Sequence, residues 1–288
     1  MPGAWDIAAI IVKALAYAGS LAGSGAVSFS WLFPPQSSDE RSAVATFTVA
    51  MALLGGLGSV ANVLAKSALL AGGDASGLID RQLIGAILAT NDGASLAVRA
   101  VGLIGVAAFA YQGGALRWIA AAGGLAVWMS FAMTGHTPER GVFVAGLLVV
   151  HLAAVSYWLG ALWPLRRLCR DPDVERVAAI MKRFGDIAAF VVGSLIAAGA
   201  IVAWSLLLAP AALVESSYGR LLLGKLAAVA LLLSLAALNK WRLVPALRSE
   251  GARAQAALRR SITVEMWLAG LILAVTATLT TMTGPPAG

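Results

Sequence analysis

Charged residues are scarce in this chain of 288 residues, since Asp, Glu, Lys and Arg together make up only 12% of it. A soluble domain normally carries about twice that share, because its surface must be hydrated. Hydrophobic residues make up 60% of the chain, and the mean hydropathy is +0.85. No polar stretch is long enough to form a soluble domain. The sequence therefore predicts a single integral membrane domain over residues 1–288, with the lipid bilayer as its solvent.

Cysteine and histidine are also rare, with one cysteine and two histidines. A single cysteine, Cys169, excludes an internal disulfide and any CxxC metal or redox motif. We expect this thiol to be inert within a basic loop. Two histidines leave little for acid–base catalysis, and the sequence contains no P-loop, HExxH motif or Ser-His-Asp candidate. We therefore predict that the chain is not an enzyme.

Apolar runs of roughly 20 residues recur along the chain, each long enough to cross about 30 Å of hydrocarbon as a helix. They predict an all-α bundle of about eight transmembrane helices, with proline and glycine clusters at the helix ends. A shorter, interrupted stretch at residues 77–90 predicts an interfacial helix. The expected spans are residues 7–33, 43–65, 94–112, 116–134, 141–164, 186–209, 218–244 and 258–283.

The net charge of +7 comes from basic residues that gather in two loops, at residues 166–183 and 240–260. Short basic loops of membrane proteins face the cytoplasm and its anionic lipids. The charge thus indicates orientation and gives no sign of nucleic-acid binding. With eight spans, both termini and the turn at residues 134–140 are predicted to lie on the periplasmic side.

Two methionines and a histidine occur together at the end of the fourth expected span. Met129, Met133 and His136 are spaced i, i+4, i+7, which stacks them along one helix face. Thioether sulfur and neutral imidazole suit Cu(I), whereas magnesium, calcium and manganese prefer carboxylates. The alternative is that the methionines contact lipid or neighbouring helices and that His136 is an ordinary turn residue. For Met129 taken alone we prefer this alternative.

The second histidine, His151, lies about ten residues into the fifth expected span, or roughly 15 Å along a helix. An ionisable side chain at this depth normally faces the bundle interior and has a partner. One interpretation is a metal ligand within the membrane. The other is a neutral histidine hydrogen-bonded to a neighbouring group such as Ser156 or Thr134.

A short internal similarity relates the ends of two expected spans. AMTGHTP at residues 132–138 and TMTGPP at residues 281–286 both fall on the predicted outer side. Val12-Lys13 and Val150-His151 open similar stretches in the first and fifth expected spans. One interpretation is chance similarity between helices rich in Ala, Gly and Leu. The other is a duplication, which nominates Met282 and Lys13 as counterparts of Met133 and His151.

Four other ionisable residues within the apolar runs receive structural interpretations. Glu265 is expected to pair with Arg260, Asn239 or Lys240. Lys13, Arg99 and Lys225 are expected to extend their charges to the outer interface.

Several segments together resemble the CopD family of bacterial copper resistance proteins. They are TGH at residues 134–136, VHLAAVSYWLGALWPL at 150–165, YGRLLLGK at 218–225 and ALNKWRLVPAL at 237–247. The resemblance covers residues 135–279, about half the chain, and implies a CopD-like core at about 135–283. It also implies a protein of the bacterial inner membrane that moves copper, with His136 and His151 at the copper site.

We therefore expect transport or uptake of copper as Cu(I), captured on the periplasmic side by Met133 and His136 and held deeper by His151. A periplasmic copper-binding protein is the expected donor. Two alternatives remain: a membrane b-haem protein with both histidines as axial ligands, and a non-transporting membrane partner that assists copper delivery to periplasmic chaperones or oxidases.

Overall fold

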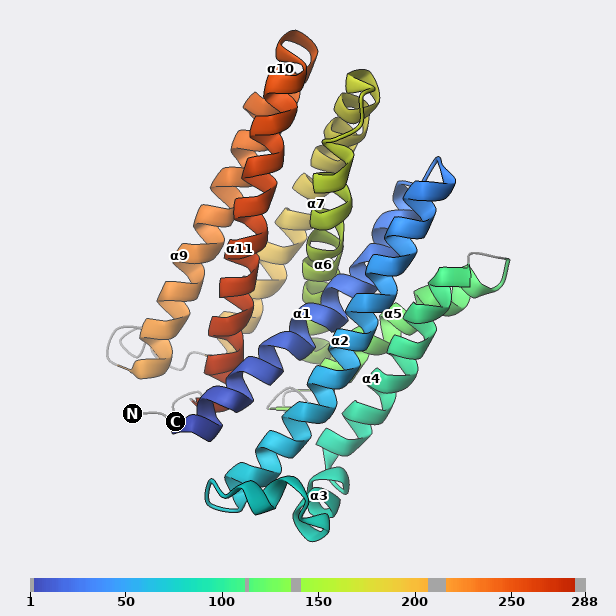
Figure 1. The fold of residues 1–288 in the computed structure, drawn as a ribbon. Helices are drawn as coiled ribbons and strands as arrows, with labels where there is room; N and C mark the ends of the chain where they lie inside the picture. Colours follow the sequence, from blue (N-terminus) through green and yellow to red (C-terminus); the bar gives the residue numbers. More distant parts are fainter. Residues whose placement is uncertain (1–2, 112–113, 136–140, 207–215, 283–288) are drawn as a thin grey trace.

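The computed structural model describes residues 3–111, 114–135, 141–206 and 216–282. Throughout these ranges the chain forms helices joined by turns and contains no strand, so the all-α fold class is confirmed (Figure 1). The α-helices are α1 (Ala4–Leu32), α2 (Ser38–Leu70), α3 (Arg81–Leu88), α4 (Asn91–Ala107), α5 (Leu116–Ala132), α6 (Gly141–Leu168), α7 (Val174–Leu206), α9 (Ser217–Leu238), α10 (Val244–Glu250) and α11 (Ala252–Met282). Two 3₁₀ turns, η1 (Ala75–Leu78) and η2 (Ala108–Tyr111), and a π-helix, η4 (Asn239–Leu243), complete the order.

The number of helices that can cross a membrane is smaller by strict criteria than the sequence predicts. Among the described residues, five segments are long and apolar enough: α1, α2, α6, Tyr218–Glu250 and α11. Helices α3 and α4, bent by 78° at their junction, would together make a sixth, and α5 is apolar but has 17 residues. The chain is thus a multi-pass helical membrane protein. Each of the eight expected spans overlaps a helix, but the number eight stays a prediction.

Short polar side chains start several of the helices. Ser37 accepts a hydrogen bond from the backbone N–H of Glu40 at the start of α2, and Ser216 accepts one from Gly219 at the start of α9. Asp80 and Thr90 cap α3 and α4 in the same way. Such caps satisfy backbone N–H groups that have no partner inside the helix. They fix the polar turns at the ends of the bundle.

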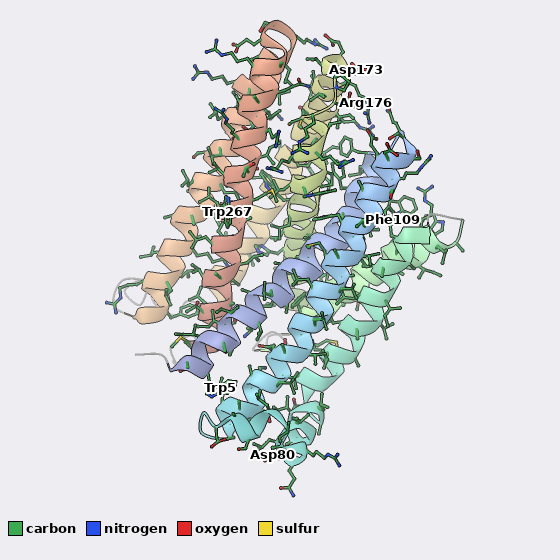
Figure 2. The ribbon with its side chains drawn as sticks, in the orientation of Figure 1. Trp5, Asp80, Phe109, Asp173, Arg176 and Trp267 are labelled. Atoms are coloured by element: carbon green, nitrogen blue, oxygen red, sulfur yellow. The ribbon has the colours of Figure 1, made fainter. Side chains whose placement is uncertain are left out.

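Helix α1 lies at the centre of the bundle, where it packs against α2, α4, α5, α6 and α11. The basic turn between α6 and α7 and the basic α10 segment lie at one end of the molecule (Figure 1). Trp5 and Asp80 mark the opposite end, and Asp173 and Arg176 the basic end (Figure 2). Having both basic turns at one end agrees with the positive-inside prediction. The side of the membrane on which this end lies stays a prediction.

Glycines allow α1 to approach its neighbours closely. A Cβ built on Gly25 of α1 would lie 1.6 Å from the carbonyl oxygen of Ser156 in α6, and one built on Gly160 would lie 2.1 Å from Gly25. Gly19 meets Gly55 of α2 in the same manner, at 2.2 Å. Membrane helices associate by such close packing, because lipid provides little hydrophobic drive. These contacts hold α2 and α6 against α1.

Candidate metal centre

Tyr17 of α1 joins the C-terminal ends of α5 and α11. Its hydroxyl lies 3.3 Å from Oγ1 of Thr280, and its ring packs edge-on against Phe131 with centroids 5.4 Å apart. Met133 follows Phe131 by two residues, and Met282 follows Thr280 by two residues. The two helix ends that carry these methionines are therefore anchored to the same side chain, although they are far apart in sequence.

Lys13 binds the last turn of α11. Its Nζ donates to the carbonyl oxygen of Thr280 at 2.8 Å and lies 3.4 Å from Oγ1 of Thr281. A cation is favourable at this position, because the C-terminal carbonyls of a helix carry partial negative charge. Lys13 therefore contacts the residue before Met282, a contact that the sequence did not predict.

Arg99 of α4 is partly buried and its guanidinium bonds to neighbouring helices, while its reach to the outer interface stays a prediction. Its guanidinium donates to the hydroxyls of Ser130, Ser95 and Ser59 at 3.0, 3.1 and 3.3 Å. It also stacks over the ring of Phe131 at 3.9 Å from the centroid. Hydroxyl bonds and the aromatic face replace the water that the charge would otherwise need. The partners come from three helices, so spacing along the chain could not reveal them.

Positive charge exceeds negative charge in this part of the bundle. Lys66 of α2 pairs with Asp92 of α4 at 2.6 Å, and both lie close enough to Lys13 to act on it electrostatically, as does Arg99. Among the described residues, these three cations and one carboxylate leave a formal surplus of two positive charges. A further cation bound nearby is repelled in proportion to its charge, so a monovalent ion is tolerated better than a divalent one.

The predicted ligands lie around this junction and on α6. Met129 and Met282 are 52% and 42% exposed, and Met133 is half-buried at the C-cap of α5. Gly135, with φ of +70°, ends the helix as its position in the sequence predicts. His136 lies outside the described residues. His151 is half-buried on α6 with its Nδ1 enclosed.

Histidine, cysteine, aspartate and glutamate do not form a metal-binding group on their own in the described ranges. No three of these residues come close enough together there to hold an ion. The methionine sulfurs at the ends of α5 and α11 are of the type that suits Cu(I).

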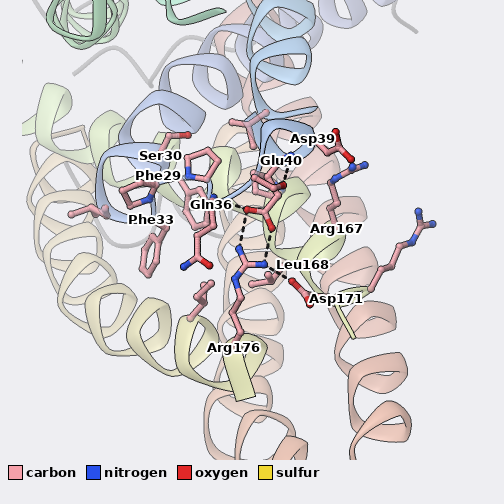
Figure 3. Close-up of a pocket in the computed structure, with 18 of the residues that line it drawn as sticks. Phe29, Ser30, Phe33, Gln36, Asp39, Glu40, Arg167, Leu168, Asp171 and Arg176 are labelled. Carbon is pink, nitrogen blue, oxygen red and sulfur yellow. Dashed lines mark hydrogen bonds and ion pairs between the residues drawn. The ribbon is translucent and has the colours of Figure 1, made fainter. Parts of the chain in front are cut away.

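A pocket of about 520 Å³ opens at the basic end, away from the Tyr17 junction (Figure 3). Arg176 lies within its lining, where it bonds to Glu40 at 2.7 Å and also to Asp171. Its lining includes no methionine, histidine or cysteine among the described residues. The neighbouring Cys169 is buried, and burial raises the pKa of its thiol to about 12, in agreement with the expected inertness. This pocket offers no soft ligand to a metal.

Comparison with known proteins identifies the family. The family described as "Copper resistance protein D" matches residues 178–279, and the one described as "Copper resistance protein D-like, N-terminal domain" matches residues 4–144. The chain belongs to the copper resistance protein D family. Membership extends to the N-terminal half, beyond residues 135–279, where the resemblance in sequence was found.

One relative within the copper resistance protein D family is the Copper resistance protein D of Pseudomonas syringae pv. tomato. It is 32% identical to this chain in an alignment of 177 positions, and the match covers 56% of each protein. The match therefore spans about half the length of that relative. No solved structure matches the chain.

Proposed function

We propose that this chain conducts copper across the bacterial inner membrane toward the cytoplasm and receives it as Cu(I) from a periplasmic copper-binding protein. Family membership supports a role in copper handling. The contacts of Tyr17 with Phe131 and Thr280 support the route most directly, because they gather the helix ends that carry Met133 and Met282.

The outer ligands are Met133, His136 and Met282, with Met129 one helical turn deeper on α5. Thioethers and neutral imidazole add no charge of their own, so the bound site carries only the single charge of Cu(I). A site with only this single charge suits a region with surplus positive charge, because the repulsion is smallest there for a monovalent ion. Few and neutral ligands also permit release, which a conduit requires.

His151 provides the next ligand, on α6 within the bundle. Helix α6 packs against α1, α5 and α11, the three helices that meet at Tyr17. This packing supports a transfer from the outer ligands to His151 inside the bundle. Beyond His151 the path runs between α6 and α11 toward the basic end.

An anaerobic Cu(I) titration of the purified protein against a competing chelator tests the ligand set. We expect stoichiometric binding that weakens at least tenfold in the double variant Met133→Leu/Met282→Leu and in His151→Ala. Met181→Leu is the matched control, because Met181 is a buried methionine at the basic end and this exchange conserves volume. Binding that is unchanged in all the variants would refute the proposed ligands.

Uptake into proteoliposomes tests conduction separately. Vesicles with the wild-type protein should accumulate copper from an external Cu(I) complex, and vesicles with His151→Ala should not. Binding without uptake would show that the chain receives copper but does not transport it. A Soret band in the purified protein would indicate a haem-binding role instead.

A further inference from the structure

Glu265 of α11 is a buried carboxyl that the copper path described above does not use. Its side chain is 4% exposed, and the amide Nδ2 of Asn239 donates a hydrogen bond to its Oε1. The buried indole of Trp158 on α6 approaches the same carboxyl. Of the three partners expected from the sequence, Asn239 is confirmed. No cation pairs with Glu265 in the ranges that the structure describes.

The neighbouring cations are bound elsewhere. Lys240 Nζ contacts Asp186 at 3.2 Å and the carbonyl oxygen of Gly185 at 2.9 Å, and Arg166 donates to Oγ1 of Thr263 at 2.8 Å. The titratable and charged residues on the elements packed against α11 are Asp6, Lys13 and Tyr17 on α1, His151, Tyr157, Arg166 and Arg167 on α6, Tyr218, Arg220 and Lys225 on α9, Lys240 and Arg242 on η4, and Arg248 and Glu250 on α10.

Asn239 can bond to this carboxyl in both of its protonation states. The ionised carboxylate accepts from the amide Nδ2, whereas the protonated carboxyl donates its O–H to the amide oxygen. That oxygen, Oδ1 of Asn239, is buried and has no hydrogen-bond partner among the described residues. Oδ1 of Asn239 is therefore available to accept a hydrogen bond from the protonated carboxyl of Glu265.

The backbone at Asn239 is specialised. Residues 239–243 form a π-helix, in which the N–H of Val244 reaches back to the carbonyl oxygen of Asn239. A π-helical turn places an extra residue in the helix and is common at functional sites. Here Asn239 is 9% exposed and faces Glu265, while Trp241 two residues later lies on the outer surface.

Trp158, whose indole approaches the Glu265 carboxyl, is on the same helix, α6, as His151, the proposed copper ligand. His151 and Trp158 are seven residues apart, so they share a helix face and lie about 10 Å apart along the axis. A cation at His151 thus stabilises a negative charge at Glu265 across an interior that excludes water.

We infer that Glu265 and Asn239 form an intramembrane proton site that releases its proton when copper occupies His151. The O–H bond of the Glu265 carboxyl breaks, the proton passes to water, and the carboxylate balances the incoming charge of Cu(I). One monovalent cation replaces another, so the bundle keeps its net charge. This coupling rests on the proposed copper function, whereas the proton site itself does not.

Infrared spectroscopy of the purified protein tests the proton site without copper. We expect a C=O stretching band of a protonated carboxyl that shifts on transfer to deuterated water and is absent in Glu265→Gln. Glu250→Gln is the matched control, because Glu250 is an exposed carboxylate on α10. The band should move to higher frequency in Asn239→Leu, which removes its acceptor. Absence of the band from the wild-type spectrum would overturn the proton site. Persistence of the band in Glu265→Gln would also overturn it.

Proton release on Cu(I) addition tests the coupling. In weakly buffered solution the wild type should release about one proton per bound copper, and the band of the protonated carboxyl should disappear. Glu265→Gln should bind copper with about no proton release. Copper binding that leaves the wild-type band unchanged would overturn the coupling. Absence of Cu(I) binding in the wild type would refute the proposed function, and with it the coupling, while the infrared band still decides the proton site.

Discussion

Gly25 of α1 and Gly160 of α6 meet backbone to backbone, since a Cβ on Gly160 would lie 2.1 Å from the carbonyl carbon of Gly25. The contact fixes how α6 crosses the central helix. It therefore also sets where His151, the proposed deep ligand, lies relative to Tyr17. Tyr17 in turn contacts the helix ends that carry the proposed outer ligands. Small residues at this crossing determine the geometry of the proposed path.

Replacement of Gly160 by alanine should destabilise the bundle by about 1–3 kcal/mol, because the added methyl group overlaps the α1 backbone. Gly146→Ala on the same helix is the control, since a Cβ there meets nothing within 4 Å. The control should be neutral or stabilising by up to about 1 kcal/mol. Thermal unfolding in detergent measures both, and equal effects would contradict the crossing.

Replacement of Lys13 by leucine should tighten Cu(I) binding, because it removes a positive charge bound next to Met282 without adding a ligand. For charges roughly 10 Å apart at an effective dielectric of about 20, the gain is ~1.7 kcal/mol, or about fifteenfold in affinity. Lys182→Leu is the control, since Lys182 is exposed and pairs with Asp186. The chelator competition measures the affinities. Unchanged binding in Lys13→Leu would place copper farther from the last turn of α11.

The ion pair between Arg176 and Glu40 should make stability depend on pH. The guanidinium of Arg176 holds the pKa of the Glu40 carboxyl below its ordinary value. A lowered pKa stabilises the fold above the unfolded-state value of about 4.3, and this contribution is lost as pH falls through the folded-state value. The difference in Tm between wild type and Glu40→Gln should thus be present at neutral pH and vanish in acid. A difference that grows on acidification would have the wrong sign.

Reporter fusions test the orientation. Fusions after Arg167 and after Arg248 should both report the cytoplasm, because both follow basic segments. A fusion after Asp80 should report the opposite side, since Asp80 lies at the other end of the bundle (Figure 2). A shared signal from Arg167 and Asp80 would refute the arrangement.

Hydropathy predicted the helices because each apolar run is a local property of the sequence. The end of α5 shortly before Gly135 also followed from a local signal, and the burial of a carboxyl in an apolar run predicted that Glu265 needs a partner such as Asn239. The serine partners of Arg99 did not, because Ser59 and Ser130 come from other helices and look like ordinary small residues. The copper ligands stay predictions, and His136 among them lies outside the described residues.

The contact between Lys13 and Thr280 joins positions 267 residues apart. During synthesis α1 is made before α11 and can pair with α2 early, but the ammonium group of Lys13 has no partner from α11 until that helix is inserted. The contact between α1 and α11 therefore forms late in assembly. A chain interrupted before α11 would carry an unsatisfied lysine on its central helix, which gives membrane quality control a feature by which to recognise it.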